Sequence, residues 1–207
     1  SGSAHGKFTV NEGILVPRSL AASQGGDATL SLEAAITYDG TNEPIVPAIN
    51  QALIGTPSVG ELFTVGPVKI NGTLVDAIQS INVDFGIRLI TKGGDGSVWP
   101  SYVAIMSIEP IITVRTLDAM ALYTWGLDGT AQSATDSLIY FRKKAEGSTN
   151  VADATAEHVK IAVDEGMIYV TDVGGGHGAE SEATIVIRPT YDESNAILAI
   201  TAASAIT

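Results

Sequence analysis

The chain has 207 residues, of which 45% are hydrophobic and 16% charged, so it is apolar enough to fold and too weakly charged to be disordered. It has no cysteine, which excludes disulfide scaffolds, thiolate catalysis and cysteine-ligated zinc sites. Its formal net charge of −12 argues against a surface that binds nucleic acid by neutralising phosphates, although not against one that repels nucleic acid.

Short segments of alternating apolar and polar residues recur along the chain between turn residues, which predicts an antiparallel β-sandwich or barrel. Asn71 and Gly72 separate two of these segments and predict a type I′ hairpin, because both residues tolerate positive φ. We expect strands over residues 7–10, 28–38, 62–70, 74–90, 102–108, 111–116, 137–144, 158–163, 167–173, 183–188 and 196–200.

The clearest alternation lies between residues 78 and 89. Apolar side chains at Ile81, Val83, Phe85 and their i+2 neighbours alternate with polar ones such as Asn82 and Asp84. One face of this segment is therefore predicted to be buried and the other to face water, as in an antiparallel sheet.

One helix is predicted over residues 117–126. Thr116 can cap it, Asp118 favours the positive end of the helix dipole, and Gly126 ends it. A second, weaker helical pattern covers residues 47–53. A helix of about ten residues is marginal in water, so the first must pack on a sheet, through a face formed by Leu117, Met120, Ala121 and Trp125.

The two ends of the chain are similar to each other. We predict that 1–54 is a β-hairpin unit that resembles 154–207 and that 55–207 is the main β domain, with one continuous domain over 5–207 as the alternative. The repeat indicates either pseudo-twofold symmetry or a segment of a tandem array. The first copy has His5, Lys7, Val10, Glu12, Gly13, Asp27–Leu30, Thr37–Asp39 and Asn42, and the second has His158, Lys160, Val163, Glu165, Gly166, Glu182–Ile185, Thr190–Asp192 and Asn195.

Motifs for catalysis or cofactors are weak. Asp84-Phe85-Gly86 matches a kinase magnesium motif but lies in an alternating strand without its companion loops. The glycines at 174–178 follow a strand but precede another β pattern, so no helix N-terminus could receive a phosphate. We expect no catalytic residues, no cofactor and no metal, although His177, Glu180 and Glu182 could form a metal site and 93–96 a calcium turn.

Four segments resemble tail tube and related virion proteins of tailed bacteriophages. The resemblance spans most of residues 65–207. Its segments are 81–87, 113–129, 140–145 and 151–158, which include Asn82-Val83-Asp84-Phe85-Gly86, Leu127-Asp128-Gly129 and Tyr140-Phe141-Arg142-Lys143-Lys144.

The resemblance implies a mostly β, tail-tube-like sandwich or barrel with a flanking helix, in a non-enzymatic subunit that forms rings, commonly hexameric, or tubes. The subunit would associate with itself and with other tail proteins by edge-strand and loop contacts. DNA would pass without specific binding, no membrane would be involved, and the protein would reside in the virion of a phage or prophage after synthesis in the bacterial cytoplasm. The residues we expect in assembly contacts are Asp84, Arg88, Asp95, Trp99, Arg142, Lys143 and Lys144.

Two other functions remain open. An adhesion or carbohydrate-binding module would need an exposed aromatic platform, and Trp99, in a glycine-rich turn before Pro100, could supply one. An enzyme without a short signature is disfavoured, because no acid, base and nucleophile converge in the pattern. The basic residues 142–144 could instead serve solubility.

Overall fold

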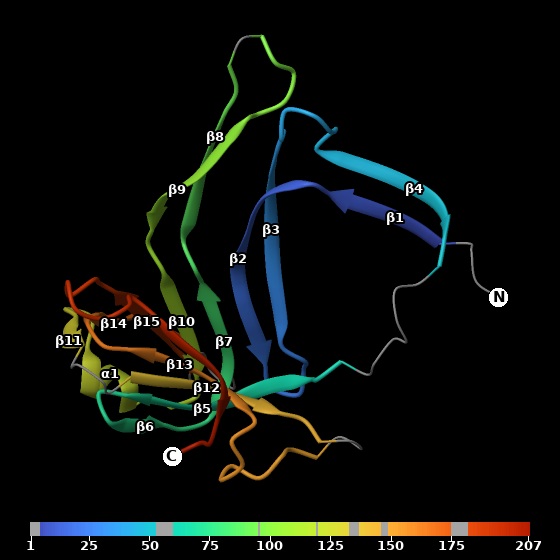
Figure 1. Ribbon diagram of the computed structural model, residues 1–207. Helices are drawn as coiled ribbons and strands as arrows, with labels where there is room; N and C mark the ends of the chain where they lie inside the picture. Colours follow the sequence, from blue (N-terminus) through green and yellow to red (C-terminus); the bar gives the residue numbers. More distant parts are fainter. Residues whose placement is uncertain are drawn as a thin grey trace. The chain divides into compact units, whose positions relative to one another are not determined.

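The computed structural model describes residues 5–52, 60–94, 96–118, 120–132, 137–145, 149–174 and 182–207 (Figure 1). The described chain is mostly antiparallel β-structure with one short helix, which confirms the predicted fold class of a β-sandwich type. The chain divides into two compact units. Unit 1 contains Ser1–Arg18, Leu32–Gly60 and Ile87–Ile108, and unit 2 contains Ser19–Ser31, Glu61–Gly86 and Glu109–Thr207.

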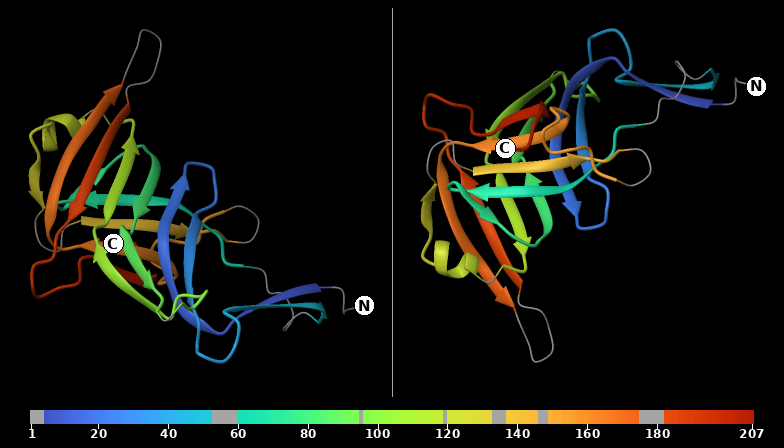
Figure 2. Two further views of the ribbon diagram at one scale, coloured as in Figure 1. Left: turned by 90° about the horizontal axis from the view of Figure 1, so that it is seen from above. Right: turned by 90° about the horizontal axis from the view of Figure 1, so that it is seen from below.

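Two sheets hold most of the strands. Figure 2 shows β14, β15, β10 and β7 side by side in the larger sheet. Its seven strands follow the order β11 (Thr130–Gln132), β14 (Gly166–Gly174), β15 (Glu182–Pro189), β10 (Ile111–Thr116), β7 (Ile78–Asp84), β2 (Glu12–Ser23) and β3 (Thr29–Thr37). The five strands of the smaller sheet follow the order β16 (Ala199–Ser204), β13 (His158–Val163), β12 (Ser137–Lys143), β5 (Phe63–Ile70) and β6 (Thr73–Val75).

The core of the molecule lies in unit 2. It is built from inward-facing, β-branched and aromatic side chains that alternate along each strand with exposed ones, as expected for sheets with one wet face. These side chains are fully or almost fully buried and include Val68, Ile70, Ile81, Val83, Ile112, Val114, Ile139, Phe141, Ile161, Val163, Ile168, Val170, Ile185 and Ile187.

Unit 1 contains two small two-stranded sheets and the adjoining parts of β2 and β3. One sheet pairs β1 (His5–Val10) with β4 (Ile45–Gln51), and the other pairs β8 (Ile87–Lys92) with β9 (Tyr102–Ile108). Among its described residues only Val16, Thr37, Pro44 and Ile87 are buried. Unit 1 therefore has very little core of its own.

The predicted hairpin at Asn71-Gly72 is confirmed. Ile70 pairs with Thr73, and the two residues between them have φ values of 48° and 73°. Both central residues of a type I′ turn need positive φ, which an asparagine and a glycine adopt at little cost.

The predicted helix is shorter than expected. Helix α1 spans Met120–Trp125, and Gly126 ends it at a φ of 61°. Asp118 Oδ1 accepts a hydrogen bond from the Met120 amide at 2.9 Å, so Asp118 caps the helix more directly than Thr116 does. Ala121 and Trp125 are buried as predicted, but Met120 is 63% exposed, so its assignment to the buried face was wrong.

Two other expectations were wrong. Residues 47–53 were expected to be helical, but their described part lies in strand β4 and the residue after it, because the pairing of β4 with β1 overrides a weak helical pattern. The segment 74–90 was expected to be one strand, but it is divided into β6, β7 and β8. Gly86, at a φ of 58°, separates β7 from β8, and a Cβ there would lie 1.9 Å from the Glu109 carbonyl oxygen.

The longest strand was missed by the sequence patterns. Strand β2 has twelve residues, and Pro17 interrupts an apolar run that does not alternate. Its exposed residues lie mostly at its start, where no neighbouring core imposes a period of two. The alternation at 78–89 is confirmed for Ile81, Val83, Phe85 and Ile87, which are all buried.

Candidate assembly surface

The similar ends of the chain have the same strand pairing. We call β1–β4 the first repeat and β13–β16 the second repeat. In the first repeat His5 pairs with Gln51, and in the second His158 pairs with Ser204, each followed by a register shift before the next lysine. Three further pairs correspond at a constant offset in residue number: Lys7 with Ala48, Phe8 with Pro47 and Thr9 with Val46, against Lys160 with Thr201, Ile161 with Ile200 and Ala162 with Ala199. Among the described pairs, that of Val10 with Ile45 is found only in the first repeat.

Two glycines occupy equivalent positions at the start of the second strand of each repeat. Gly13 and Gly166 both have a φ of 152°. A Cβ would lie 2.4 Å from the Ala35 carbonyl oxygen in the first case and 2.2 Å from the Arg188 carbonyl oxygen in the second. Only glycine therefore fits this close approach between the second and third strands.

Two aspartates close the equivalent turns. The Oδ1 atom of Asp39 accepts hydrogen bonds from the backbone nitrogens of Thr41 and Asn42 at N···O distances of 2.8 and 2.7 Å. Its Oδ2 atom accepts one from Asn42 Nδ2 at 2.9 Å. Asp192 does the same with Ser194 and Asn195 at 2.8, 2.6 and 2.8 Å. These hydrogen bonds, first of all the one from the asparagine backbone, lower the pKa of both carboxyl groups.

The repeats differ in burial at equivalent positions. In the second repeat Ile161 and Val163 on β13, Ile168 on β14 and Ile185 on β15 are completely buried. Their counterparts in the first repeat are exposed, by 75% at Phe8, 49% at Val10, 65% at Leu15 and 52% at Leu32. We call these four residues of unit 1 the open face. The sequence similarity matched Ile185 with Leu30, but in the structure its counterpart is Leu32, because Gly13 lies against Ala35 where Gly166 lies against Arg188.

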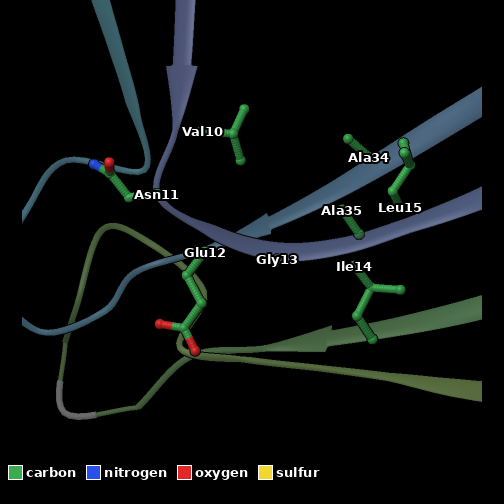
Figure 3. Close-up of a pocket in the computed structure, with 8 residues that line it drawn as sticks. All are labelled: Val10, Asn11, Glu12, Gly13, Ile14, Leu15, Ala34 and Ala35. Atoms are coloured by element: carbon green, nitrogen blue, oxygen red, sulfur yellow. The ribbon is translucent and has the colours of Figure 1, made fainter.

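A hollow of about 540 Å³ lies within the open face. Figure 3 shows Val10, Leu15 and Ala34 on one side of β2, whereas Glu12 and Ile14 point to the other. The equivalent of Ala34 in the second repeat is Ile187, which is fully buried. The hollow therefore lies beside Ala34, where the second repeat has the larger side chain of Ile187. Its lining residues are Val10, Asn11, Glu12, Gly13, Ile14, Leu15, Ala34 and Ala35.

The strand edges of the repeats also differ. In the second repeat β12 pairs with β13, β10 pairs with β15, and β11 pairs with residues 166–168 of β14. In the first repeat, as far as the structure describes the chain, β1 has no strand partner besides β4, and β3 has none besides β2. Strand β2 pairs with β7 over residues 19–23, and no strand of the described ranges pairs with its equivalent edge at 13–15. Unpaired strand edges are templates for addition of another strand.

Three of the four basic residues predicted as assembly contacts, Arg142, Lys143 and Lys144, form ion pairs within unit 2. Arg142 forms a bidentate pair with Asp153, with N···O distances of 2.9 and 2.6 Å. Lys144 contacts Asp27 at 2.5 Å. These pairs explain the cluster without a partner molecule, and whether it also contributes to assembly stays a prediction.

Lys143 bridges two carboxylates. Its Nζ atom lies 2.8 Å from Glu157 and 2.7 Å from Glu61. Hydrogen bonds to Glu157 and then to Glu61 raise the pKa of Lys143, and the bond from Lys143 lowers the pKa of Glu157. The bridge thus ties β12 to the residues that precede its two neighbours in the sheet, β5 and β13.

The other four predicted assembly residues fall between positions 84 and 99 of the sequence. Asp84 ends β7 and accepts the Gly86 amide at 2.9 Å, and Arg88 is exposed on β8. Asp95 is outside the described residues. Trp99, in the loop between β8 and β9, is 46% exposed and lines a hollow of about 370 Å³ in unit 1 with Ile36, Glu43, Pro44, Ile45 and Pro100.

No arrangement for metal binding is found in the described part of the chain. There, no three His, Cys, Asp or Glu side chains lie together as a metal site requires. Of the proposed metal ligands, His177 and Glu180 are outside the described residues, whereas Glu182 lies 3.4 Å from Arg115. No helix in the described ranges is long and apolar enough to cross a membrane.

Comparisons of the chain with protein-family models, with curated proteins and with solved structures gave no match.

Proposed function

We propose that this chain is a non-enzymatic structural protein of a phage virion, a subunit of the tail tube or of a tail-associated ring that assembles through edge strands and loops. The observation that carries the proposal is that unit 1 exposes apolar side chains together with strand edges that no other described strand pairs with. Soluble proteins that remain monomeric rarely expose large apolar patches, and they usually protect their strand edges. The resemblance to tail tube proteins, which spans most of residues 65–207, suggests that the subunits assemble into rings or tubes.

The charge distribution supports the same proposal. Unit 2 holds −11 of the net charge of −12, because unit 1 has four basic and five acidic residues. An acidic surface repels the phosphates of DNA, so a passage lined by unit 2 would let DNA move without binding. The charged residues of unit 1 are Lys7, Arg18, Arg88 and Lys92 and Glu12, Glu33, Asp39, Glu43 and Asp95.

Light scattering over a concentration series, with negative-stain images at the highest concentration, tests this proposal. We expect the mass to rise to that of a closed ring, and the images to show rings or stacked tubes. A strict monomer at all concentrations would contradict the proposal.

A second candidate function is an adhesion or carbohydrate-binding module. It is favoured by Trp99, whose partly exposed ring borders a hollow next to Pro100, as in sites where sugars stack on aromatic rings. A glycan array with the wild-type chain and Trp99→Ala tests it. Binding that is lost in the variant would favour this function, and absence of any signal would exclude the glycans on the array.

A further inference from the structure

The second repeat shows what covers the apolar face of this strand arrangement. Its outer edges are occupied by β12 and β10, which contribute Ile139, Phe141, Ile112 and Val114 to the core. Both strands come from the same chain but lie outside the repeat. The first repeat has the same register, and no other described strand pairs with the outer edges of β1 and β3, where equivalent strands could pair.

We propose that a second molecule of this chain covers the open face of unit 1, and that its strand β9 is the element that docks there. The inference rests on self-association, which is part of the proposed function, and names the surface that performs it. The contact would bury Phe8, Val10, Leu15 and Leu32 against apolar side chains of β9 and would extend the edge of β1 or β3 by main-chain hydrogen bonds.

Strand β9 has the chemistry that this role requires. It pairs only with β8 among the described strands, so its other edge is available. Its side chains at Tyr102, Ile105, Met106 and Ile108 are 55%, 47%, 61% and 46% exposed. An isolated two-stranded sheet is marginal in water, so β8 and β9 also gain order from such a contact.

The open face and β9 expose similar amounts of apolar surface. If a whole aliphatic side chain presents about 60 to 120 Å², the four residues of the open face expose about 220 Å² and the four exposed residues of β9 about 190 Å². The two surfaces therefore match in size, and main-chain hydrogen bonds along the strand edge would add to the contact.

The charge balance favours another molecule of the same chain as the occupant. Two copies of unit 1, each with a net charge of −1, approach without appreciable repulsion, whereas two copies of unit 2, at −11 each, repel. The two surfaces are also different, so the contact is head-to-tail and can propagate into a ring.

A complementation experiment tests the proposal. Leu15→Glu places a charge on the open face and Met106→Glu places one on β9, while Tyr123→Glu, at a residue of α1 that is 82% exposed, is the matched control. We expect each of the first two variants to weaken self-association at least about 30-fold, the effect of one strong interface residue, and the control to assemble as the wild type does. Mass is measured by sedimentation, and circular dichroism checks that the core of unit 2 remains folded.

Mixing the two defective variants gives the decisive result. The Leu15→Glu molecule has an intact β9 and the Met106→Glu molecule has an intact open face, so we expect the mixture to form dimers that neither variant forms alone. A mixture that stays monomeric would overturn the assignment of β9 to this face. Wild-type assembly that neither variant weakens would overturn the inference but leave the proposed function, whereas a monomeric wild type would overturn both.

Discussion

The first and second repeats share their strand register, their close-packed glycine and their aspartate turn, yet one is buried in a core and the other is exposed. Local sequence determines the shared features, because turns, glycine contacts and pairing depend on residues within about 45 positions. Burial depends on strands outside the repeat, which flank β13, β14 and β15 of the second repeat, whereas among the described strands the first repeat has only β7, beside residues 19–23 of β2. The comparison shows that two segments can share one strand arrangement although only one of them is packed into a core.

The largest expected difference between the repeats is in the cost of removing apolar side chains. We expect Ile185→Ala to lower the free energy of unfolding by about 4 kcal/mol, because it leaves a cavity in a closed core. Leu32→Ala, at the equivalent exposed position, should cost less than about 1 kcal/mol. Urea unfolding at a protein concentration where the chain is monomeric measures both. Equal losses would show that the first repeat has a core after all.

The second largest difference is expected in the free energy of unfolding that is lost when each of the two equivalent histidines is removed. His158 is completely buried, its Nδ1 atom accepts the Lys143 amide at 3.1 Å, and its Nε2 atom lies 3.1 Å from the Ala152 carbonyl oxygen. His158→Ala leaves both backbone groups unpaired, so we expect a loss of about 3 kcal/mol. His5→Ala, at an exposed residue, serves as the control and should change the unfolding free energy by less than about 0.5 kcal/mol.

The two glycines allow a test of the shared geometry. In Gly166→Ala the new Cβ would meet the Arg188 carbonyl oxygen, and we expect a loss of about 2 kcal/mol in thermal unfolding. Gly13→Ala creates the same clash with Ala35, but in a unit with little core, so the main unfolding transition should move less. Hydrogen exchange at the amides of β2 and β3 should rise in Gly13→Ala, and unchanged exchange would argue against the close approach.

The smallest effect concerns the two aspartates. Because the folded-state pKa of each is lowered, its contribution to stability is present above the ordinary aspartate pKa of 3.8 and is lost as the pH falls through the folded value. We expect carboxyl titrations by NMR to give depressed pKa values for both Asp39 and Asp192. Replacing Asn195 by Ala should raise the pKa of Asp192 and leave that of Asp39 unchanged.

Much of the fold was predictable because it depends on short-range patterns. The alternation around Ile81 and Val83 identified a half-buried strand, and Asn71-Gly72 identified a hairpin. The run around Pro17 hid the longest described strand, since it does not alternate. The weak helical pattern at 47–53 failed because pairing with the distant strand β1 outweighs a local preference.

The sequence by itself determined the all-β class, the turns and the existence of the repeat, because these depend on nearest-neighbour backbone preferences and on side chains within a few residues. The candidate surface could not be predicted in this way. Phe8 and Ile161 have the same place in the same motif, and both are apolar, so nothing local distinguishes the exposed residue from the buried one. Only the tertiary structure decided that difference, because burial is set by which distant strands pair along each edge.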